Sequence, residues 1–260
     1  MTTPLRVARA ESGVVTATLT RPERKNAINS ELFEALRVCF DEVARRSEDR
    51  VLVLTGAGDA FCGGADLTDF GGDAGNQHPL EMMRDINECC LALHQVPVPV
   101  IAKVNGVAVG AGLNLALGCD LIVASDRASF CQIYTRRGIS IDFGGAWLLP
   151  RLVGLHKAKE LALLADRIPA DEALRIGLVN RVLPHAELDA AVTEWAERLA
   201  AGPPIALRMT KRLLTHSLDT TLRESLDAEA MTVAVNGATE DMKEAMRAFR
   251  EKREPRFQGR

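Results

Sequence analysis

The sequence lacks any apolar run of the length that a membrane-spanning helix needs, which is about 18 residues. Its first ten residues also lack the apolar core of a secretory signal peptide. We therefore expect a cytoplasmic protein with no membrane partner.

Neither sign of charge dominates, because 32 Lys and Arg stand against 35 Asp and Glu. The basic residues do not form one block, which argues against a nucleic-acid-binding surface. The six cysteines form no CxxC pair and have no metal-ligand spacing. We predict reduced thiols, no metal site and no nucleic-acid partner.

Two common functional motifs are also missing. Gly110-x-Gly112 has no third glycine and no βαβ context, so it does not match a dinucleotide-binding turn. Ser140 has no surrounding G-x-S-x-G, so it does not match a hydrolase nucleophile.

The order of expected elements predicts an α/β fold. Strands are expected at 14–19, 51–55, 100–104 and 121–125. Helices are expected at 30–46 with Ser30 as N-cap, at 79–95, 156–165, 170–176 and 186–201, and from 205 to the end. Such an order indicates an α/β core followed by a helical C-terminal layer. The glycine-rich stretch 71–75 is the best candidate for a mobile loop, and the longer stretch 71–79 is expected to shape a pocket.

Two glycine-rich turns, each between an expected strand and helix, are the main candidates for a site. They read FCGGADL at 61–67 and NGVAVGAGLN at 105–114. Small residues let a ligand approach the backbone, and two N–H groups aimed at one point would stabilise an enolate. Glycine content alone is explained at least as well by tight turns and close packing.

Several motifs occur together in a recognisable order. They are LTRP and NAIN at 19–22 and 26–29, the first glycine turn at 61–67, the second turn with its following helix at 106–120, the segment 130–152 with GGAWLLPRL, the segment 170–182, and AFREKR at 248–253. With these motifs the chain resembles the crotonase (enoyl-CoA hydratase/isomerase) superfamily over nearly its whole length.

The resemblance implies a crotonase (ClpP-like) spiral of ββα units with a C-terminal helical trimerisation layer. Residues 1–195 would form the spiral core with the acyl-CoA site, and residues 196–260 the C-terminal helical region. A homotrimer or a hexamer is the expected assembly. The expected ligand is an acyl-CoA thioester with a fatty, aromatic or steroid-derived acyl group. No cofactor is expected, because coenzyme A arrives as part of the substrate.

Residue by residue, the resemblance makes the backbone N–H groups of Ala65 and Ala111 the donors of an oxyanion hole. Arg24 and Lys25 would line the nucleotide end of the site, although solvated surface roles explain them equally well. Lys252 would approach a CoA phosphate, often from a neighbouring subunit. The other substrate-binding candidates are Ala27, Gly64, Asp66, Leu67, Gly110, Asn114 and Tyr134, and a structural role at its turn is also open for Asp66.

The carboxylates at the site indicate which reaction to expect. In the family's hydratases, two glutamates stand at the positions of Asn114 and Tyr134, and neither residue here can act as a carboxylate base. Asp142 stands where several single-aspartate relatives, including enoyl-CoA isomerases, place an essential acid. Its apolar neighbours Ile141 and Phe143 would raise its pKa by desolvation.

We therefore hypothesise a double-bond isomerase in which Asp142 shuttles one proton. Four alternatives are open: Asp142 caps a helix that starts near Gly144; the chain is a hydratase that uses Asp142 and a bound water; Asp142 is a nucleophile; or the chain binds CoA esters without catalysis. The last alternative is motivated by the missing glutamates.

Overall fold

The computed structural model describes residues 3–68 and 78–260, and the 71–75 stretch lies outside them. The first of two sheets has the strand order β1-β2-β3-β5-β7-β10. Its strands are β1 (Leu5–Arg9), β2 (Val14–Leu19), β3 (Val51–Gly56), β5 (Val100–Val104), β7 (Leu121–Ser125) and β10 (Arg181–Leu183). Only β1 is antiparallel to its neighbour in this sheet.

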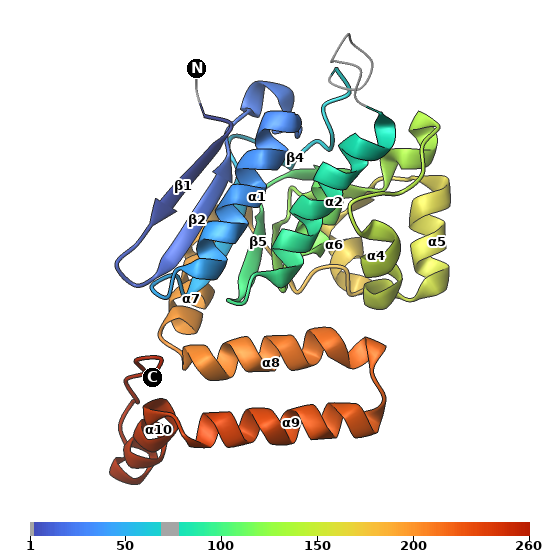
Figure 1. The fold of residues 1–260 in the computed structure, drawn as a ribbon. Coiled ribbons are helices and arrows are strands. Elements are labelled where there is room, and N and C mark those ends of the chain that lie inside the picture. Colours follow the sequence, from blue (N-terminus) through green and yellow to red (C-terminus); the bar gives the residue numbers. More distant parts are fainter. Residues whose placement is uncertain (1–2, 69–77) are drawn as a thin grey trace.

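The second sheet has the order β4-β6-β8-β9. It contains β4 (Ala60–Cys62), β6 (Val107–Val109), β8 (Ser129–Cys131) and β9 (Ile168–Pro169). The chain passes from a strand of the first sheet to one of the second and then to a helix, three times (Figure 1). These helices are α2 (Pro79–Gln95), α3 (Ala111–Leu117) and α4 (Gly145–Val153), the last preceded by the 3₁₀ helix η2 (Ile133–Arg137). The repetition confirms the expected ββα spiral.

The helix α1 (Ser30–Arg45) covers the core next to α2. Its buried stripe includes Leu32, Leu36 and Phe40, at the spacing expected for one helix face. The N-cap differs from the predicted Ser30. The carboxamide of Asn29 accepts the Leu32 N–H at 3.0 Å, because Asn29 is extended while Ser30 is already helical.

The helices after the spiral follow the prediction closely up to residue 200. They are α5 (Leu155–Leu164), α6 (Ala170–Arg175) and α7 (Leu188–Ala200). Leu188, Val192 and Ala196 of α7 pack on residues of β3, β5 and β7. The predicted boundary after residue 195 therefore falls inside a helix that covers the first sheet, and the two-region division stays a prediction.

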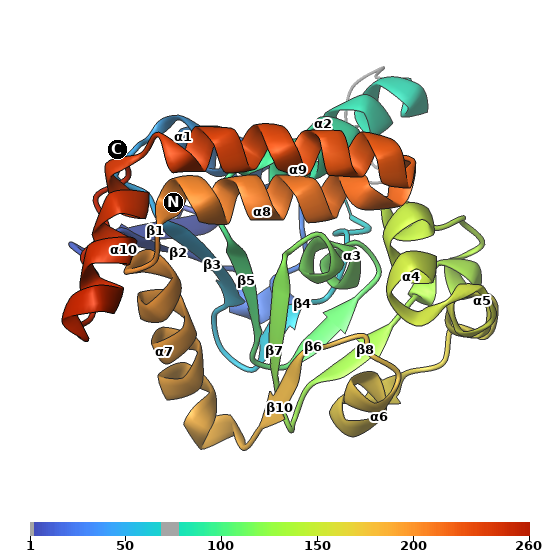
Figure 2. The same cartoon turned by 90° about the horizontal axis from the view of Figure 1, so that it is seen from below.

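The C-terminal part contains three α-helices and the 3₁₀ helix η4 (Ser217–Asp219) instead of one continuous run. The α-helices are α8 (Pro204–His216), α9 (Leu222–Gly237) and α10 (Glu240–Glu251). Thr221 starts α9 with a capping box to Glu224, and Thr239 caps α10. These N-caps start new helices inside a stretch where residue periodicity alone predicts one continuous helix. Figure 2 shows α8 and α9 side by side across one end of the spiral.

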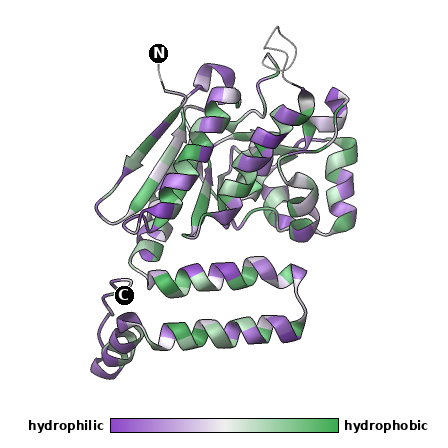
Figure 3. Cartoon of the chain, in the orientation of Figure 1, coloured by the Kyte–Doolittle hydropathy of each residue, from purple (hydrophilic) through white to green (hydrophobic). Residues whose placement is uncertain are grey.

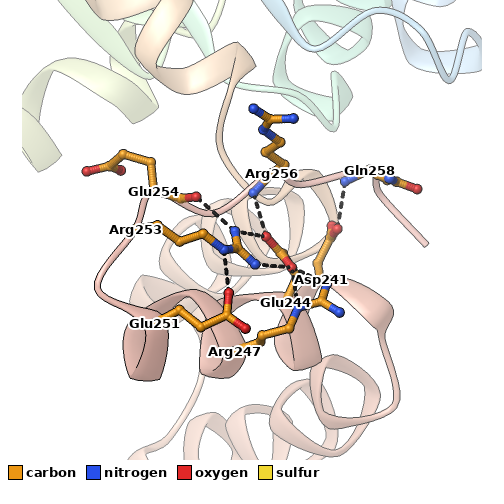
Figure 4. A network of polar contacts seen from close by, with 8 residues as sticks. All are labelled: Asp241, Glu244, Arg247, Glu251, Arg253, Glu254, Arg256 and Gln258. Atoms are coloured by element: carbon orange, nitrogen blue, oxygen red, sulfur yellow. Dashed lines mark hydrogen bonds and ion pairs between the residues drawn. The ribbon is translucent and has the colours of Figure 1, made fainter.

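The last residues fold back onto α10. The Asp241 carboxylate accepts the N–H groups of Gln258 and Gly259 at 2.7 and 2.9 Å (Figure 4). Glu244 binds the Arg253 guanidinium at 2.6 Å and accepts the Arg256 N–H at 3.1 Å. The tail is thus fixed to the helix that precedes it. Among the described helices, none combines the length and the apolar character needed to cross a bilayer.

Candidate active site

The two glycine turns follow the carboxyl ends of two neighbouring strands of the second sheet. Strands β4 and β6 are parallel neighbours, and Cys62 is in register with Ala108. Ala65 and Ala111 each stand three residues beyond this pair. The sheet register therefore puts the two predicted N–H donors at equivalent positions on adjacent strand ends.

Glycines allow these turns to pack directly on each other. A β-carbon at Gly64, where φ is +101°, would lie 2.9 Å from the Val109 carbonyl oxygen. A β-carbon at Gly112 would lie 2.5 Å from the carbonyl oxygen of Cys62. Both distances are too short for a real side chain, so close packing requires glycine here. Close packing therefore does explain these glycines. The same packing places the two turns that carry the candidate donors against each other.

Within residues 3–68 and 78–260, backbone pairing gives neither candidate N–H group an acceptor. The Gly64 carbonyl accepts the Ile28 N–H, and the Asp66 N–H donates to Ile28, both at 2.8 Å. Ala65 lies between these bonds, so in this parallel bridge its own N–H points away from Ile28. Ala111 is the first residue of α3, where the helix has no carbonyl acceptor for an N–H.

A chain of hydrogen bonds connects four polar side chains beside the second turn. Gln132 Nε2 donates to Asn114 Oδ1 at 2.7 Å, and Asn114 Nδ2 donates to Tyr134 Oη at 3.0 Å. Tyr134 Oη donates to Asp142 Oδ1 at 2.5 Å. Asn114 Nδ2 also donates to the backbone carbonyl of Asp142 at 2.8 Å. The structure thus brings Asn114, Tyr134 and Asp142 together.

This chain lies next to the start of α3. A β-carbon at Gly110 would lie 3.9 Å from Tyr134 Oη, so the phenol packs against the residue that precedes Ala111. The backbone of Gly110 has φ +52° and ψ −124°, a conformation that favours glycine. Glycine therefore allows the phenol to approach the second turn.

The environment shifts the ionisation of the groups around Asp142. Burial raises the pKa of Asp142, and the Tyr134 hydrogen bond partly opposes this. Burial and the nearby carboxylate raise the pKa of Tyr134 far above its usual value. Burial, with a smaller contribution from Asp142, raises the pKa of the Cys90 thiol to about 11. Near neutral pH, Tyr134 and Cys90 are therefore neutral, which makes Asp142 the candidate acid–base group among these three.

The Asp142 carboxylate accepts from Tyr134 and does not bond the start of α4 in the described part of the chain. Phe143 and Gly144 have φ values of +45° and +72°, and Gly144 is the N-cap without any side-chain cap bond. The Gly145 N–H donates instead to the Asp142 backbone carbonyl at 2.9 Å. The alternative in which the Asp142 side chain caps this helix is therefore wrong.

Two predicted residues of the first turn have different surroundings. The Asp66 carboxylate accepts from Thr68 Oγ1 at 2.7 Å and binds the Arg21 guanidinium at 2.8 Å. The Thr68 hydroxyl and Arg21 hold the pKa of Asp66 below its usual value. Asp66 thus binds both its own turn and Arg21 of an earlier segment, which fits the structural role left open for it. Leu67, by contrast, exposes 51% of its surface.

The predicted nucleotide-end residues lie around the 3₁₀ helix η1 (Pro22–Arg24). Arg24 and Lys25 are exposed, and Lys25 forms an ion pair with Asp59 at 2.6 Å. The Ala27 carbonyl accepts a hydrogen bond from the Arg21 guanidinium at 2.5 Å. Arg24 and Lys25 therefore face solvent, and Lys25 is held there by its ion pair with Asp59.

Lys252 does not join this group within one chain. It follows α10 as its left-handed C-cap, with φ +55°, and its side chain is exposed. Figure 1 shows α10 below α8, outside the spiral that carries the glycine turns.

Sequence reasoning missed two residues of the site. Gln132 is 1% exposed and supports Asn114, yet only its place directly after β8 marks it in the sequence. A β-carbon at Gly145 would lie 2.4 Å from Asn114 Nδ2, so this glycine makes room for the carboxamide. Both depend on long-range contacts, which residue spacing does not report.

Comparison with known proteins identifies the family. The sequence profile described as "Enoyl-CoA hydratase/isomerase" matches residues 9–260. The 1,2-epoxyphenylacetyl-CoA isomerase of Escherichia coli K12 is 38% identical over 97% of this chain and 98% of its own. The short-chain-enoyl-CoA hydratase of Clostridium acetobutylicum is 36% identical over 94% of this chain and 93% of its own. The enoyl-CoA hydratase structure from Bacillus anthracis superposes with a TM-score of 0.93 at 34% identity, covering 99% of this chain and 100% of that one. The chain is a member of the enoyl-CoA hydratase/isomerase family, the crotonase superfamily.

Proposed function

We propose that the protein is an enoyl-CoA double-bond isomerase whose single acid–base residue is Asp142. The substrate is an acyl-CoA thioester. Its carbonyl oxygen binds the N–H groups of Ala65 and Ala111, which stabilise negative charge as a C–H bond breaks. No metal or redox cofactor takes part in this reaction, because coenzyme A enters with the substrate.

The observation that carries the proposal is the identity of the groups hydrogen-bonded around Asp142. Asn114 is an amide, Tyr134 is a neutral phenol, and Asp142 supplies the carboxylate with a raised pKa. A proton shift needs one base that removes a proton from one carbon and returns it to another. The electron pair of the broken C–H bond passes to the thioester oxygen meanwhile and returns when the new C–H bond forms.

A hydratase is the second candidate, because related proteins bear that name. In that reaction Asp142 would orient a water molecule, and the same two N–H groups would hold the enolate. A hydratase working with one carboxylate must use that group for both the water and the proton. The amide and phenol that accompany Asp142 favour the isomerase.

We also propose that the protein forms a trimer or a pair of trimers. Among the described residues of α9 none is buried, and Leu222, Met231 and Val233 are each more than 60% exposed. Figure 3 shows apolar residues along both α8 and α9. Apolar surface of this extent is typical of a protein–protein interface. In such an assembly Lys252 of a second copy would approach a CoA phosphate near Arg24 and Lys25. Sedimentation of a stable monomer would contradict this assembly.

The reaction is tested with a 3-enoyl-CoA and a 2-enoyl-CoA, with products identified by NMR and mass spectrometry. The isomerase moves the double bond of the 3-enoyl substrate and adds no water to the 2-enoyl substrate. Asp142→Asn lowers turnover about 100-fold or more, as expected for loss of a general base. The control Asp171→Asn removes an exposed carboxylate on α6 and leaves turnover unchanged. Full activity of Asp142→Asn, or hydration without isomerisation, refutes the proposal.

A further inference from the structure

The carboxamide of Asn114 has no contact with solvent, and all of its hydrogen bonds in the described residues go to the protein. The resemblance to relatives suggests Asn114 as a substrate-binding residue. Its burial, and the slot that Gly145 leaves for it, suggest instead that it acts on the residues beside it.

One acceptor fixes the direction of the whole hydrogen-bond chain. The backbone carbonyl of Asp142 can only accept, so the Asn114 atom that faces it must be the donor Nδ2. Asn114 Oδ1 then faces Gln132 and needs a donor, which is Nε2. Tyr134 Oη accepts from Asn114 Nδ2 and is left with its own hydrogen to donate to Asp142 Oδ1. Every bond in the chain therefore points toward Asp142.

The orientation of Gln132 leaves one of its atoms without a partner. Gln132 Oε1 is buried and accepts no hydrogen bond within the described part of the chain. A buried acceptor without a partner destabilises a fold, so its presence calls for a reason. The geometry offers a reason: Gln132 must direct its donor Nε2 toward Asn114, and this orientation leaves Oε1 on the side that has no donor.

We propose that Gln132 and Asn114 are positioning residues for the acid–base chemistry of Asp142. They aim the Tyr134 hydroxyl at Oδ1 and leave Oδ2 as the oxygen that takes and returns the substrate proton. This inference rests on the proposed function of Asp142. Within residues 3–68 and 78–260, Oδ2 accepts no hydrogen bond, so it is free for that exchange. The C–H bond breaks as the O–H bond at Oδ2 forms, and the reverse occurs at the second carbon.

The titratable groups that face Asp142 are few in the described segments. Tyr134 of η2 donates to it, and Cys90 of α2 interacts with it electrostatically. Neither carries charge near neutral pH, so the hydrogen bond that Tyr134 donates is the contact that opposes the effect of burial on the carboxylate. If the Tyr134 hydroxyl no longer points at Asp142, the carboxylate loses this hydrogen-bond donor and ionises at a higher pH.

The test compares turnover, KM and pH–rate profiles of Gln132→Met and Asn114→Leu, both close in shape to the native side chains. We expect kcat to fall about 3- to 10-fold for Gln132→Met and further for Asn114→Leu, as for loss of one and of several hydrogen bonds. KM stays near the wild-type value, and the acid limb of the profile moves to higher pH. Gln132→Glu, whose protonated carboxyl can still donate to Asn114, retains more activity than Gln132→Met at acidic pH.

A matched control is Thr135→Val, next to Tyr134 in η2. The Thr135 hydroxyl bonds the Ala162 carbonyl of α5 and lies outside the chain, so kinetics stay unchanged. Folding is followed by thermal unfolding, which should change little for Gln132→Met, because one buried acceptor without a partner replaces another. Wild-type kcat and pH profile in both variants, or a rise in KM alone, overturns the inference. Full activity of Asp142→Asn would instead refute the proposed function itself.

Discussion

The carboxamide of Asn114 lies against the α-carbon of Gly145, in the space that a side chain at that position would occupy. A β-carbon on Gly145 would be 2.4 Å from Asn114 Nδ2 and 2.7 Å from Oδ1. Because Asn114 holds both the Tyr134 hydroxyl and the Asp142 carbonyl, the absence of a side chain at Gly145 sets the position of the proposed base.

Gly145→Ala should therefore impair catalysis without adding or removing a functional group. The added methyl group must displace the Asn114 amide, and such overpacking costs about 1–3 kcal/mol of stability. Turnover should fall with it, because the Tyr134 hydroxyl loses its support. Kinetics and chemical denaturation measure the two effects. Gly237→Ala on α9, where nothing lies within 4 Å of the added atom, is the control; an equal loss of turnover in both variants would contradict the prediction.

Tyr134→Phe should move the acid limb of the pH–rate profile to higher pH. A carboxylate base works in its ionised form, so the rate rises as pH passes upward through its pKa. The Tyr134 hydrogen bond lowers the pKa of Asp142, and its loss lets burial raise that pKa further. The profile of kcat against pH is the measurement. An unchanged acid limb would mean that the Tyr134 hydrogen bond does not control the pKa of the group that titrates.

Relative to the wild type, Asp142→Asn should gain more unfolding free energy at neutral pH than at acidic pH. A carboxyl group with a raised pKa binds more protons folded than unfolded, so its contribution to stability falls as pH rises between the two pKa values. Asparagine does not titrate, and its Oδ1 can still accept from Tyr134. Thermal unfolding at pH 4 and pH 7.5 should show the larger relative gain at pH 7.5. A gain that is the same at both values would show that Asp142 has no raised pKa.

Asn29→Ala should destabilise the protein by about 1 kcal/mol, the usual effect of losing an N-cap. Asn29 accepts the Leu32 N–H at the start of α1, whose buried face belongs to the core. Turnover of the folded enzyme should not change. Urea unfolding combined with an activity assay checks both statements. A stability equal to wild type would show that another group caps α1.

Much of the fold could be predicted because buried strands and amphipathic helices leave local patterns. The strands at 100–104 and 121–125 and the helix at 79–95 have the predicted bounds. The N-cap of α1 was wrong by one residue, since Asn29 and Ser30 are both good caps and only backbone geometry separates them. The breaks within the C-terminal run were missed, because the caps at Thr221 and Thr239 interrupt an otherwise helical composition.

The candidate site was predictable only as far as single positions carry chemistry. Asp142, Asn114 and Tyr134 are recognisable from the resemblance, and the structure brings them within hydrogen-bond distance. Gln132 was not predictable, because its hydrogen bond to Asn114 crosses from the end of β8 to α3. The positive φ of Phe143, just before the N-cap of α4, also has no signature in residue type.

The measurement that tests the central claim most directly follows deuterium through a single turnover. A 3-enoyl-CoA carrying deuterium at C2 is converted in ordinary water, and the product is analysed by mass spectrometry and NMR. If Asp142 is the one base, part of the deuterium taken from C2 is returned to C4 of the same molecule. A product with no deuterium at C4, with equal turnover by Asp142→Asn, would contradict the single-base isomerase.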